Sequence, residues 1–310
     1  MRSATALVCA LLWTFARTCA AADVEHALYL DEDLLSGFSQ DADYTGGLAV
    51  TFAGERAEGE RYEIEIGAAA FTPEQIGNPD VDPDDRPYAG LIYGSGALDH
   101  SSERGGATTT LAIGVLGLPL IASAQRAVHR AMHSQQPRGW RHQISDGGEP
   151  TLRLSHERRW LSEPVEVAGQ RLQWLYRAGA GVGFLTDLSF GIAARAGQFS
   201  DVRWDIHTSP TGLGDRAAFG RTDERDRFFY ATLTARVPVY DVFVQGQFRD
   251  SDITVSSRDR RYLVPAASVG FVFGLPKGRN LHYFIRAQQS DVRLADRSDT
   301  AVYAGISLSW

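Results

Sequence analysis

The stretch AVYAGISLSW, residues 301–310, alternates between apolar and small or polar side chains and ends on an aromatic residue. One face of this alternation is apolar and consists of Val302, Ala304, Ile306, Leu308 and Trp310. A period of two is the template of a β-strand, because successive strand side chains point to opposite faces. The sequence therefore predicts that the chain ends on a strand with one apolar face.

The same period recurs along the chain, in RYEIEIGAAAF (61–71), RFFYATLTARV (227–237) and NLHYFIRAQQ (280–289). The polar faces of these runs carry Arg, Glu and Gln. A transmembrane barrel predicts this pattern, with lipid outside and a polar lumen inside. A soluble β-sandwich predicts the same alternation with the apolar face turned inward. Alternation alone therefore does not decide between the two.

The first residues have the features of an export signal. Residues 1–22 contain an early Arg2, an apolar stretch and three final alanines that fit an A-x-A cleavage site. We expect a signal peptide over 1–22 and a mature chain over 23–310. Both cysteines, Cys9 and Cys19, lie in this leader. The mature chain therefore has no disulfide, although exported proteins commonly use them.

The net charge of the whole chain is −7, and the leader holds two arginines and no acid, so the mature chain carries −9. This balance argues against a nucleic-acid partner. No mature window approaches the ~18 apolar residues of a membrane-spanning helix. Three features favour one fold over the other. The chain is expected to be exported but has no disulfide, strand patterns cover most of its length, and its last residue is an aromatic that resembles the recognition signal of outer-membrane barrels. That fold is an all-β transmembrane antiparallel β-barrel in the bacterial outer membrane.

We expect twelve strands, an even number as in single-chain bacterial barrels. Their predicted ranges are 26–33, 44–54, 61–71, 87–98, 107–117, 150–160, 171–182, 187–197, 227–239, 262–274, 280–290 and 300–310. A thirteenth apolar run, 240–248, is interpreted as an extension of the ninth strand or a ribbon in its loop. With a periplasmic N-terminus, the outside connections are 34–43, 72–86, 118–149, 183–186, 240–261 and 291–299.

Two connections stand out. Residues 198–226 are assigned to the periplasm although they are long for a periplasmic turn. The outside segment 118–149 contains LIASAQRAVHRAMHSQQ, which predicts a short helix in an extracellular loop. Its apolar stripe is expected to pack on the barrel rim and consists of Leu118, Ile121, Ala124, Val128 and Met132.

Four polar patches converge on the outer mouth in this topology. They are LDEDLL (30–35), DADYTGGL (41–48), DDRPYAG (84–90) and AQRAVHRAMH (124–133). Each has a structural interpretation as well as a functional one. The acids of LDEDLL can form a solvated loop edge, and the glycines of the second patch can mark a hairpin exit. Likewise, His129 can be an exposed helix residue, and Arg86 can pair with Asp84 or Asp85.

The functional interpretation joins the patches into one site. Carboxylate and carbonyl oxygens are the ligands that Ca²⁺ prefers. A neutral imidazole beside such a site can take a proton from water, and the metal can polarise an ester carbonyl. The mature chain has no Gly-x-Ser-x-Gly motif and no thiol. The nucleophile expected from the sequence is therefore activated water.

Several motifs carry a family resemblance that covers most of the mature chain in order. LYLDEDLLSGFSQDADYTGGLAVTF, DDRPYAGLIYGSGAL, QRAVH, GWRHQISDGGEP and LRLSHERRW together resemble the outer-membrane lipid A 3′-O-deacylase family. The resemblance implies a twelve-stranded barrel that hydrolyses the ester-linked 3′ acyl chain of lipid A, with Ca²⁺ and a catalytic histidine, much as secreted phospholipases A2 act. It implies lipopolysaccharide and outer-membrane lipids as partners, a monomer, and a site that faces the cell exterior.

The resemblance also implies roles for individual residues. His129 matches the catalytic histidine, and Gln125 matches the glutamine one helical turn before it. Asp33 matches the calcium aspartate, and Thr45 the threonine that begins the second strand. Glu32 stands where the family has an asparagine that helps to bind the metal or the oxyanion. We expect catalytic roles for His129, Gln125, Thr45 and Glu32, and metal ligation by Asp33 and Glu32.

Arg86 and Asp85 are expected to hold the residues of this site in place without contacting the substrate themselves. The chain departs from the family at Glu32, at Gly46 where an asparagine is usual, at His133 and at Gln135. These departures leave two alternatives to lipid A deacylation, an outer-membrane phospholipase and a non-catalytic barrel that keeps the scaffold. In a regular strand, moreover, Glu32 and Asp33 would point to opposite faces. Either the strand is irregular at its end or Asp33 alone is a ligand.

Overall fold

The computed structural model of the protein describes residues 24–37, 43–57, 60–204, 206–211, 215–217, 223–293 and 300–310. The predicted signal peptide lies outside the described residues. Among the helices described, none has the length and apolar character needed to cross a membrane.

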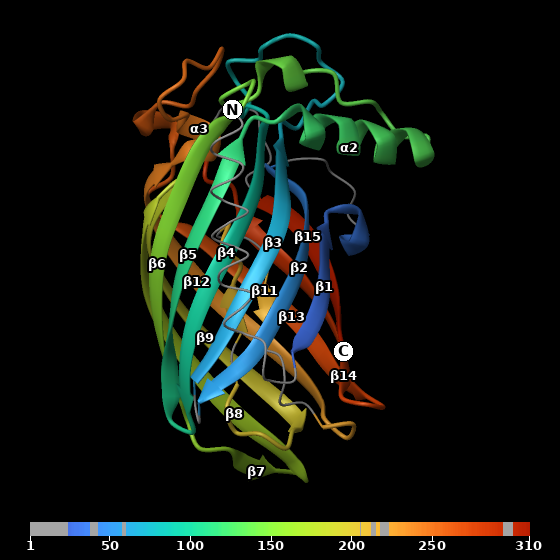
Figure 1. Ribbon diagram of the computed structural model, residues 1–310, viewed down its shortest axis with the longest axis vertical. Helices are drawn as coiled ribbons and strands as arrows, with labels where there is room; N and C mark the ends of the chain where they lie inside the picture. Colours follow the sequence, from blue (N-terminus) through green and yellow to red (C-terminus); the bar gives the residue numbers. More distant parts are fainter. Residues whose placement is uncertain are drawn as a thin grey trace.

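Twelve long strands form a closed antiparallel barrel, as predicted (Figure 1). They are β1 (Glu25–Glu32), β2 (Asp43–Ala57), β3 (Glu60–Thr72), β4 (Ala89–Ser102), β5 (Gly105–Leu116), β6 (Glu149–Leu161), β8 (Gln170–Gly183), β9 (Leu185–Gln198), β12 (Arg227–Asp241), β13 (Val264–Leu275), β14 (Arg279–Gln289) and β15 (Thr300–Ser309). Their order around the wall follows the chain, with β6 paired to β8 and a short ribbon strand β7 (Val165–Val167) beside β8. The barrel closes where β1 pairs with β15.

The period-two pattern separates the two faces of the wall. In β1, Tyr29 and Asp31 are buried in the lumen, whereas Leu28 and Leu30 are exposed on the outside. The outer surface exposes large apolar side chains on many strands, among them Leu48, Ile66, Leu111, Leu152, Leu188, Leu233, Val269 and Ile306. An apolar exterior around a closed barrel is the arrangement of a transmembrane barrel. The sandwich alternative is therefore wrong.

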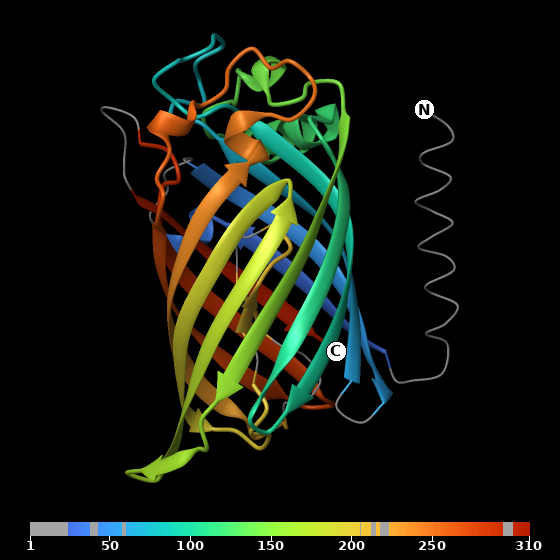
Figure 2. The same cartoon turned by 90° about the vertical axis from the view of Figure 1, so that its left-hand side faces the viewer.

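The barrel has two distinct ends (Figures 1 and 2). The helix-bearing end holds η1 (Leu34–Ser36), α2 (Pro119–Ala131), η2 (Trp140–His142), α3 (Val242–Gln245) and η3 (Ser257–Asp259). Tight turns between strands occupy most of the opposite end, the hairpin end. The predicted loop helix is confirmed as α2, which begins with Pro119 at its first turn, where a missing N–H costs nothing. The interpretation of 240–248 as strand or ribbon is wrong beyond Asp241, because the chain there forms the helical turn α3.

Residues 198–226 do not form a simple loop at the hairpin end, which corrects our expectation. Their described part runs inside the barrel, where β10 (Ile206–Thr208) pairs with β11 (Asp215–Ala217). The ring of Trp204 packs against Phe228, and the carbonyl of Pro210 accepts a hydrogen bond from Arg153 at 3.3 Å. The guanidinium of Arg216 reaches Asp31 on the inner face of β1 at 2.9 Å. The described part of the segment therefore lies in the lumen and contacts its wall.

Two small polar cavities border this lumenal segment. One polar cavity, between Arg153, Arg177 and Arg286, measures about 80 Å³. Another, near Asp43 and Arg86, measures about 20 Å³. Such volumes hold a few water molecules at most.

Candidate active site

The first group of predicted site residues lies where β1 meets β2 at the helix-bearing end. β1 ends at Glu32, and Asp33 leaves the strand into the turn η1. The amide of Asp33 still donates to the carbonyl of Thr45 at 3.2 Å, while its own carbonyl accepts from the amide and hydroxyl of Ser36. The Asp33 residue is only 4% exposed. Strand β1 therefore ends before Asp33, which fits the alternative of an irregular strand end. Metal ligation by Asp33 and Glu32 stays a prediction.

Thr45 sits at a second irregularity, where the register of β2 against β3 shifts between Tyr44 and Gly46. Its hydroxyl lies 2.5 Å from the hydroxyl of Thr72 on β3, and both residues are buried. The shift turns the Thr45 side chain out of the regular alternation of β2. Thr45 is thereby held directly beside the backbone of Asp33.

Glu32 and Gly46 face each other across the β1–β2 ladder. A Cβ placed on Gly46 would lie 2.8 Å from Oε2 of Glu32 and 2.9 Å from the carbonyl of Asp31. The Glu32 side chain thus covers the position where a residue larger than glycine would project. The two departures from the family pattern therefore lie opposite each other, with the longer acid on β1 facing the glycine on β2.

The second group of predicted residues lies on α2. His129 is only 6% exposed, so its interpretation as an exposed helix residue is wrong. Its Nδ1 lies 2.6 Å from the main-chain carbonyl of Gln135. A carbonyl oxygen can only accept, so Nδ1 must carry the hydrogen. In the neutral imidazole, Nε2 is then the nitrogen with the lone pair, the form that a general base requires.

Gln125 lies one turn before His129 on the same buried face of α2. Its Oε1 accepts a hydrogen bond from the indole nitrogen of Trp140 at 2.6 Å. Trp140 in turn packs on Tyr88, with ring centroids 4.8 Å apart. This contact fixes which way the amide of Gln125 points. Its Nε2 has no hydrogen-bond acceptor among the described residues, so it remains a donor for a bound group.

Two glycines bring α2 and the segment after it close to the wall. A Cβ on Gly90 of β4 would lie 3.0 Å from the side chain of Ile121, and one on Gly77 would lie 2.1 Å from the Gln135 side chain. The amide of Arg138 also donates to the carbonyl of Ile76 at 2.9 Å. These contacts hold Gln135, and with it the imidazole of His129, against the loop that precedes β4.

The predicted apolar stripe of α2 is only partly correct. Ile121 packs on the wall together with Ala122, as expected for such a stripe. Val128 and Met132 instead point away from the barrel and are each 47% exposed. The buried face of the helix is therefore partly polar, because it carries Gln125 and His129.

Asp85 and Arg86 lie in the loop before β4 and act on different neighbours. The carboxylate of Asp85 accepts main-chain hydrogen bonds from Glu74 at 2.8 Å and from Arg86 at 2.6 Å, which shapes the loop. The Arg86 side chain turns into the lumen and pairs with Asp43 at 3.0 Å. The expected pairing of this arginine with Asp84 or Asp85 is therefore wrong. Since Asp43 precedes Thr45 by two residues, Arg86 supports the start of β2.

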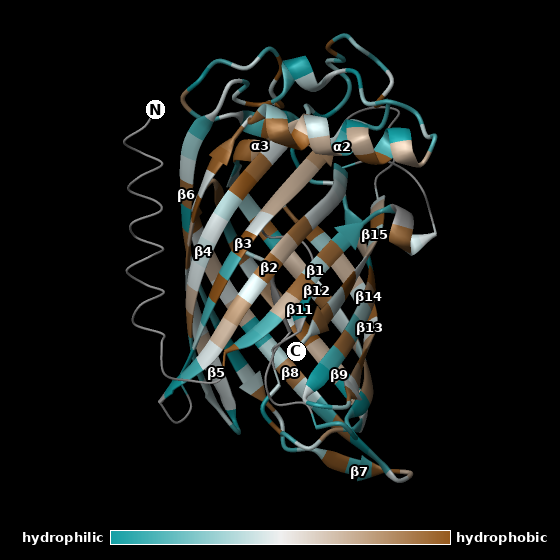
Figure 3. Ribbon diagram, turned by 45° about the vertical axis from the view of Figure 1, so that its right-hand side comes forward, coloured by the Kyte–Doolittle hydropathy of each residue, from teal (hydrophilic) through white to brown (hydrophobic). Residues whose placement is uncertain are grey.

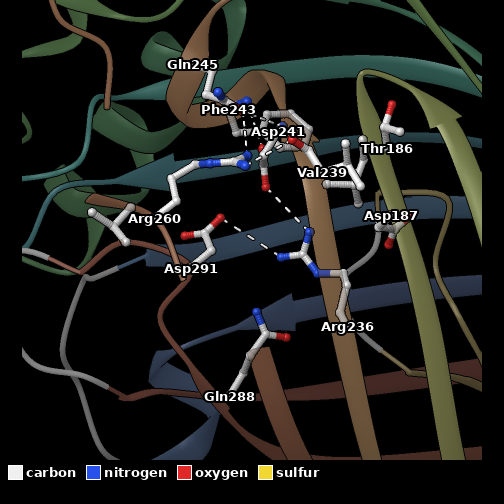
Figure 4. A network of polar contacts seen from close by, with 12 residues as sticks. Thr186, Asp187, Arg236, Val239, Asp241, Phe243, Gln245, Arg260, Gln288 and Asp291 are labelled. Atoms are coloured by element: carbon white, nitrogen blue, oxygen red, sulfur yellow. Dashed lines mark hydrogen bonds and ion pairs between the residues drawn. The ribbon is translucent and has the colours of Figure 1, made fainter. Parts of the chain in front are cut away.

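A charged cluster of Arg236, Asp241 and Asp291 was not foreseen from the sequence (Figure 4). Arg236 of β12 lies 3.5 Å from Asp241 and 4.0 Å from Asp291, and Arg86 lies 3.9 Å from Asp291. Burial alone would raise the pKa of Asp291, but the positive charges of Arg86 and Arg236 outweigh it and hold that pKa below its ordinary value. The sequence held one signal for this cluster, because the alternation of its strand places Arg236 on the polar face that points into the lumen.

Glu32, Asp33 and Thr45 thus form one contiguous group, and Gln125 with His129 forms another on α2. Both stand at the helix-bearing end (Figure 1). No cluster of three or more acidic, histidine or cysteine side chains able to hold a metal occurs among the described residues. The acids at the end of β1 nevertheless offer oxygen donors only, which suits Ca²⁺ if main-chain, hydroxyl or water oxygens complete the set.

Comparisons with known proteins identify the family. A family model described as outer membrane protein LpxR matches residues 4–310. The solved structure of LpxR from Salmonella typhimurium is similar with a TM-score of 0.75 and 16% identity, and the match covers 92% of this chain and 99% of that chain.

More distant barrels give lower scores. The KdgM porin matches with a TM-score of 0.41, 6% identity and coverage of 92% of this chain and 98% of that one. The translocator domain of the autotransporter NalP from Neisseria meningitidis matches with a TM-score of 0.42, 10% identity and coverage of 100% and 97%. None of the curated protein sequences matches the chain. On the family match, the chain belongs to the LpxR family, the outer-membrane lipid A 3′-O-deacylase family that its motifs resemble.

Proposed function

We propose that this protein is an outer-membrane esterase that removes the ester-linked 3′ acyl chain of lipid A, with His129 as the general base. Family membership supports a lipid A deacylase in the outer membrane. The single observation that carries the histidine role is the 2.6 Å contact between Nδ1 of His129 and the carbonyl of Gln135. It leaves Nε2 as the nitrogen that can take a proton.

The reaction proceeds in two proton transfers. Nε2 of His129 takes a proton from water while the water oxygen attacks the ester carbonyl carbon. The tetrahedral species then collapses, the bond from the acyl carbon to the 3′ oxygen breaks, and His129 returns the proton to that oxygen. The products are a free fatty acid and a 3′ hydroxyl on the lipid A sugar.

Neighbouring residues orient these steps. Gln125, with its Oε1 held by Trp140, offers its Nε2 hydrogens to the oxygen that gains negative charge. Thr45, fixed against Thr72, positions the Asp33 loop beside the substrate. Two further residues act indirectly. Asp85 shapes the loop before β4, and Arg86 supports the start of β2.

Asp33, assisted by Glu32, would hold Ca²⁺, which when bound polarises the ester carbonyl. The burial of Asp33 and the oxygen-only donors of the two acids support this ion rather than a transition metal. Tight turns at the hairpin end are typical of the periplasmic side of such barrels. We therefore place the helix-bearing end, and the site, at the cell exterior, in a protein that acts as a monomer.

The test uses purified protein reconstituted with vesicles that contain both lipopolysaccharide and glycerophospholipids. We expect fatty acid release from lipid A alone, its loss on calcium chelation, and about 10²–10⁴-fold slower release by His129→Asn. Release from the glycerophospholipids instead would assign a phospholipase. No release from either lipid would leave the protein as a non-catalytic barrel.

A further inference from the structure

The helix α2 divides into three longitudinal sectors. The sector against the barrel holds Ile121, Ala122, Gln125 and His129. A second sector is exposed and apolar: Leu120 is 64% exposed and Val128 47%, and Ala124 lies between them at four-residue spacing.

The third sector is polar. Arg126 and Arg130 lie two residues after Ala124 and Val128, and therefore about 200° around the helix from them. Arg130 is exposed and Arg126 partly so. A helix that faces water on its outer side exposes polar residues, whereas α2 exposes an apolar sector and a basic sector on different sides. That division is typical of a helix lying in a membrane interface.

The place where α2 packs identifies what covers its apolar sector. The residues of the wall beneath it are Ala68 and Ala70 of β3 and Ile92 of β4. On β3 these positions continue the outward face of Ile66, which is 48% exposed, while the alternate residues Ala69 and Phe71 belong to the lumenal core. Helix α2 therefore sits against the lipid-facing surface of the barrel at its helix-bearing end (Figure 3). The exposed Leu120 and Val128 of its apolar sector extend that surface.

We propose that α2 is an interfacial helix, with Leu120 and Val128 inserted among the acyl chains of the outer leaflet and Arg126 and Arg130 at the level of the anionic headgroups. Two observations support this assignment. The apolar sector of α2 continues the outward apolar face of β3, and the two arginines lie on the other side of the helix from that sector. The occupant of the apolar sector is thus lipid, not a second protein.

The consequence concerns His129 and rests on the proposed function. An ester of a lipid lies where the acyl chains meet the headgroups. Around the helix axis, His129 points about 100° from both Val128 and Arg130, so it lies between the apolar and the basic sector. The helix therefore sets the imidazole at the depth of the ester bond without lifting the lipid out of the membrane.

The test uses the cysteine-free mature chain, because both cysteines fall in residues 1–22. Single cysteines replace Leu120, Val128, Ser123 or Arg130, and each carries a nitroxide spin label in protein reconstituted into lipopolysaccharide-containing vesicles. Collisions with oxygen report contact with lipid, and collisions with a water-soluble nickel chelate report contact with water. A label in place of Leu111, an exposed wall residue, gives the lipid reference.

We expect the labels at 120 and 128 to collide with oxygen as often as the reference label at 111. The labels at 123 and 130 should instead collide with the nickel chelate. Nickel access at 120 and 128 would overturn the proposal. So would protection of these two positions from both reagents, since that indicates a protein neighbour. The measurement is made in wild-type and His129→Asn backgrounds, so its result does not depend on whether the protein is an esterase.

A second readout links the helix to activity. Leu120→Ser and Val128→Ser should slow hydrolysis of membrane-embedded lipid about tenfold, because each removes an apolar anchor, while hydrolysis of a detergent-dispersed ester changes less than about twofold. Equal losses on both substrates would contradict an interfacial role. Ser123→Ala on the polar side serves as the matched control and should leave both rates unchanged.

Discussion

Arg216, carried by the segment that lies in the lumen, donates from Nη1 to Oδ2 of Asp31 at 2.9 Å, and Asp31 stands two residues before Asp33. The same guanidinium donates from Nε to Glu65 at 3.2 Å and lies over the ring of Tyr29. A segment that enters from the hairpin end thereby anchors the strand that ends at the candidate site.

This anchor predicts a large stability effect. Arg216→Met leaves the carboxylates of Asp31 and Glu65 buried without their shared cation, which should lower the free energy of unfolding by about 3–5 kcal/mol. Urea unfolding of the barrel in detergent measures the change. Arg225→Met, at an exposed arginine, should stay within about 0.5 kcal/mol. An equal response of the two variants would mean that Arg216 does not stabilise the barrel.

Glu32 and Gly46 should be energetically coupled. Gly46→Asn alone places side-chain atoms where Oε2 of Glu32 lies, and should destabilise the barrel. Combined with Glu32→Asn, which restores the family pattern, the cost should shrink by about 0.5–3 kcal/mol. A double-mutant cycle by urea unfolding gives the coupling energy. Simple additivity would show that the two departures are independent.

The contact between Trp140 and Gln125 should affect turnover more than binding. Trp140→Phe keeps an aromatic ring against Tyr88 but removes the donor that holds Oε1 of Gln125. We expect kcat to fall about 2- to 10-fold, the worth of one net hydrogen bond, with little change in KM. The control is Trp204→Phe, because the Trp204 indole nitrogen has no acceptor among the described residues. A change in KM alone would assign Trp140 to substrate binding.

The pH dependence of stability should reflect Asp291. Its pKa in the folded protein is held below the ordinary 3.8 by Arg86 and Arg236, so its stabilising effect is complete above 3.8 and is lost as pH falls through the lower folded value. Asp291→Asn should reduce the free energy of unfolding at neutral pH and flatten its decline below 3.8. Urea unfolding over that range tests this, with exposed Asp250→Asn as the control. Parallel curves for Asp291→Asn and wild type would contradict the assignment.

Much of the wall was predictable because strand side chains must alternate where one face meets lipid and the other a polar lumen. The count of twelve needed the rule of even strand numbers as well, because alternation also gave a thirteenth apolar run at 240–248. The lumenal segment was not predictable, because the pairing of Arg216 with Asp31 joins residues far apart in sequence and leaves no periodic signal. Counting strands from a periplasmic N-terminus assigned 198–226 to one end of the barrel. Such a count does not indicate that the chain turns into the lumen.

The candidate site shows the same division. Periodicity predicted that α2 is a helix, but it placed Val128 and Met132 on the buried face, where the structure has Gln125 and His129 instead. Alternation suggested a conflict between Glu32 and Asp33, and in the structure β1 ends at Glu32, so Asp33 is no longer bound by the strand's alternation. The hydrogen bond from His129 to Gln135 depends on a main-chain carbonyl, which no side-chain pattern reveals.

The most direct test of the central claim is mass spectrometry of lipid A from cells that express the wild type, His129→Asn or His133→Asn. His133 is exposed four residues after His129, and asparagine tolerates its positive φ of 56°. Lipid A that lacks the 3′ acyl chain with wild type and His133→Asn, and keeps it with His129→Asn, is the predicted result. Identical lipid A in all three strains, with each barrel folded in the outer membrane, would contradict it.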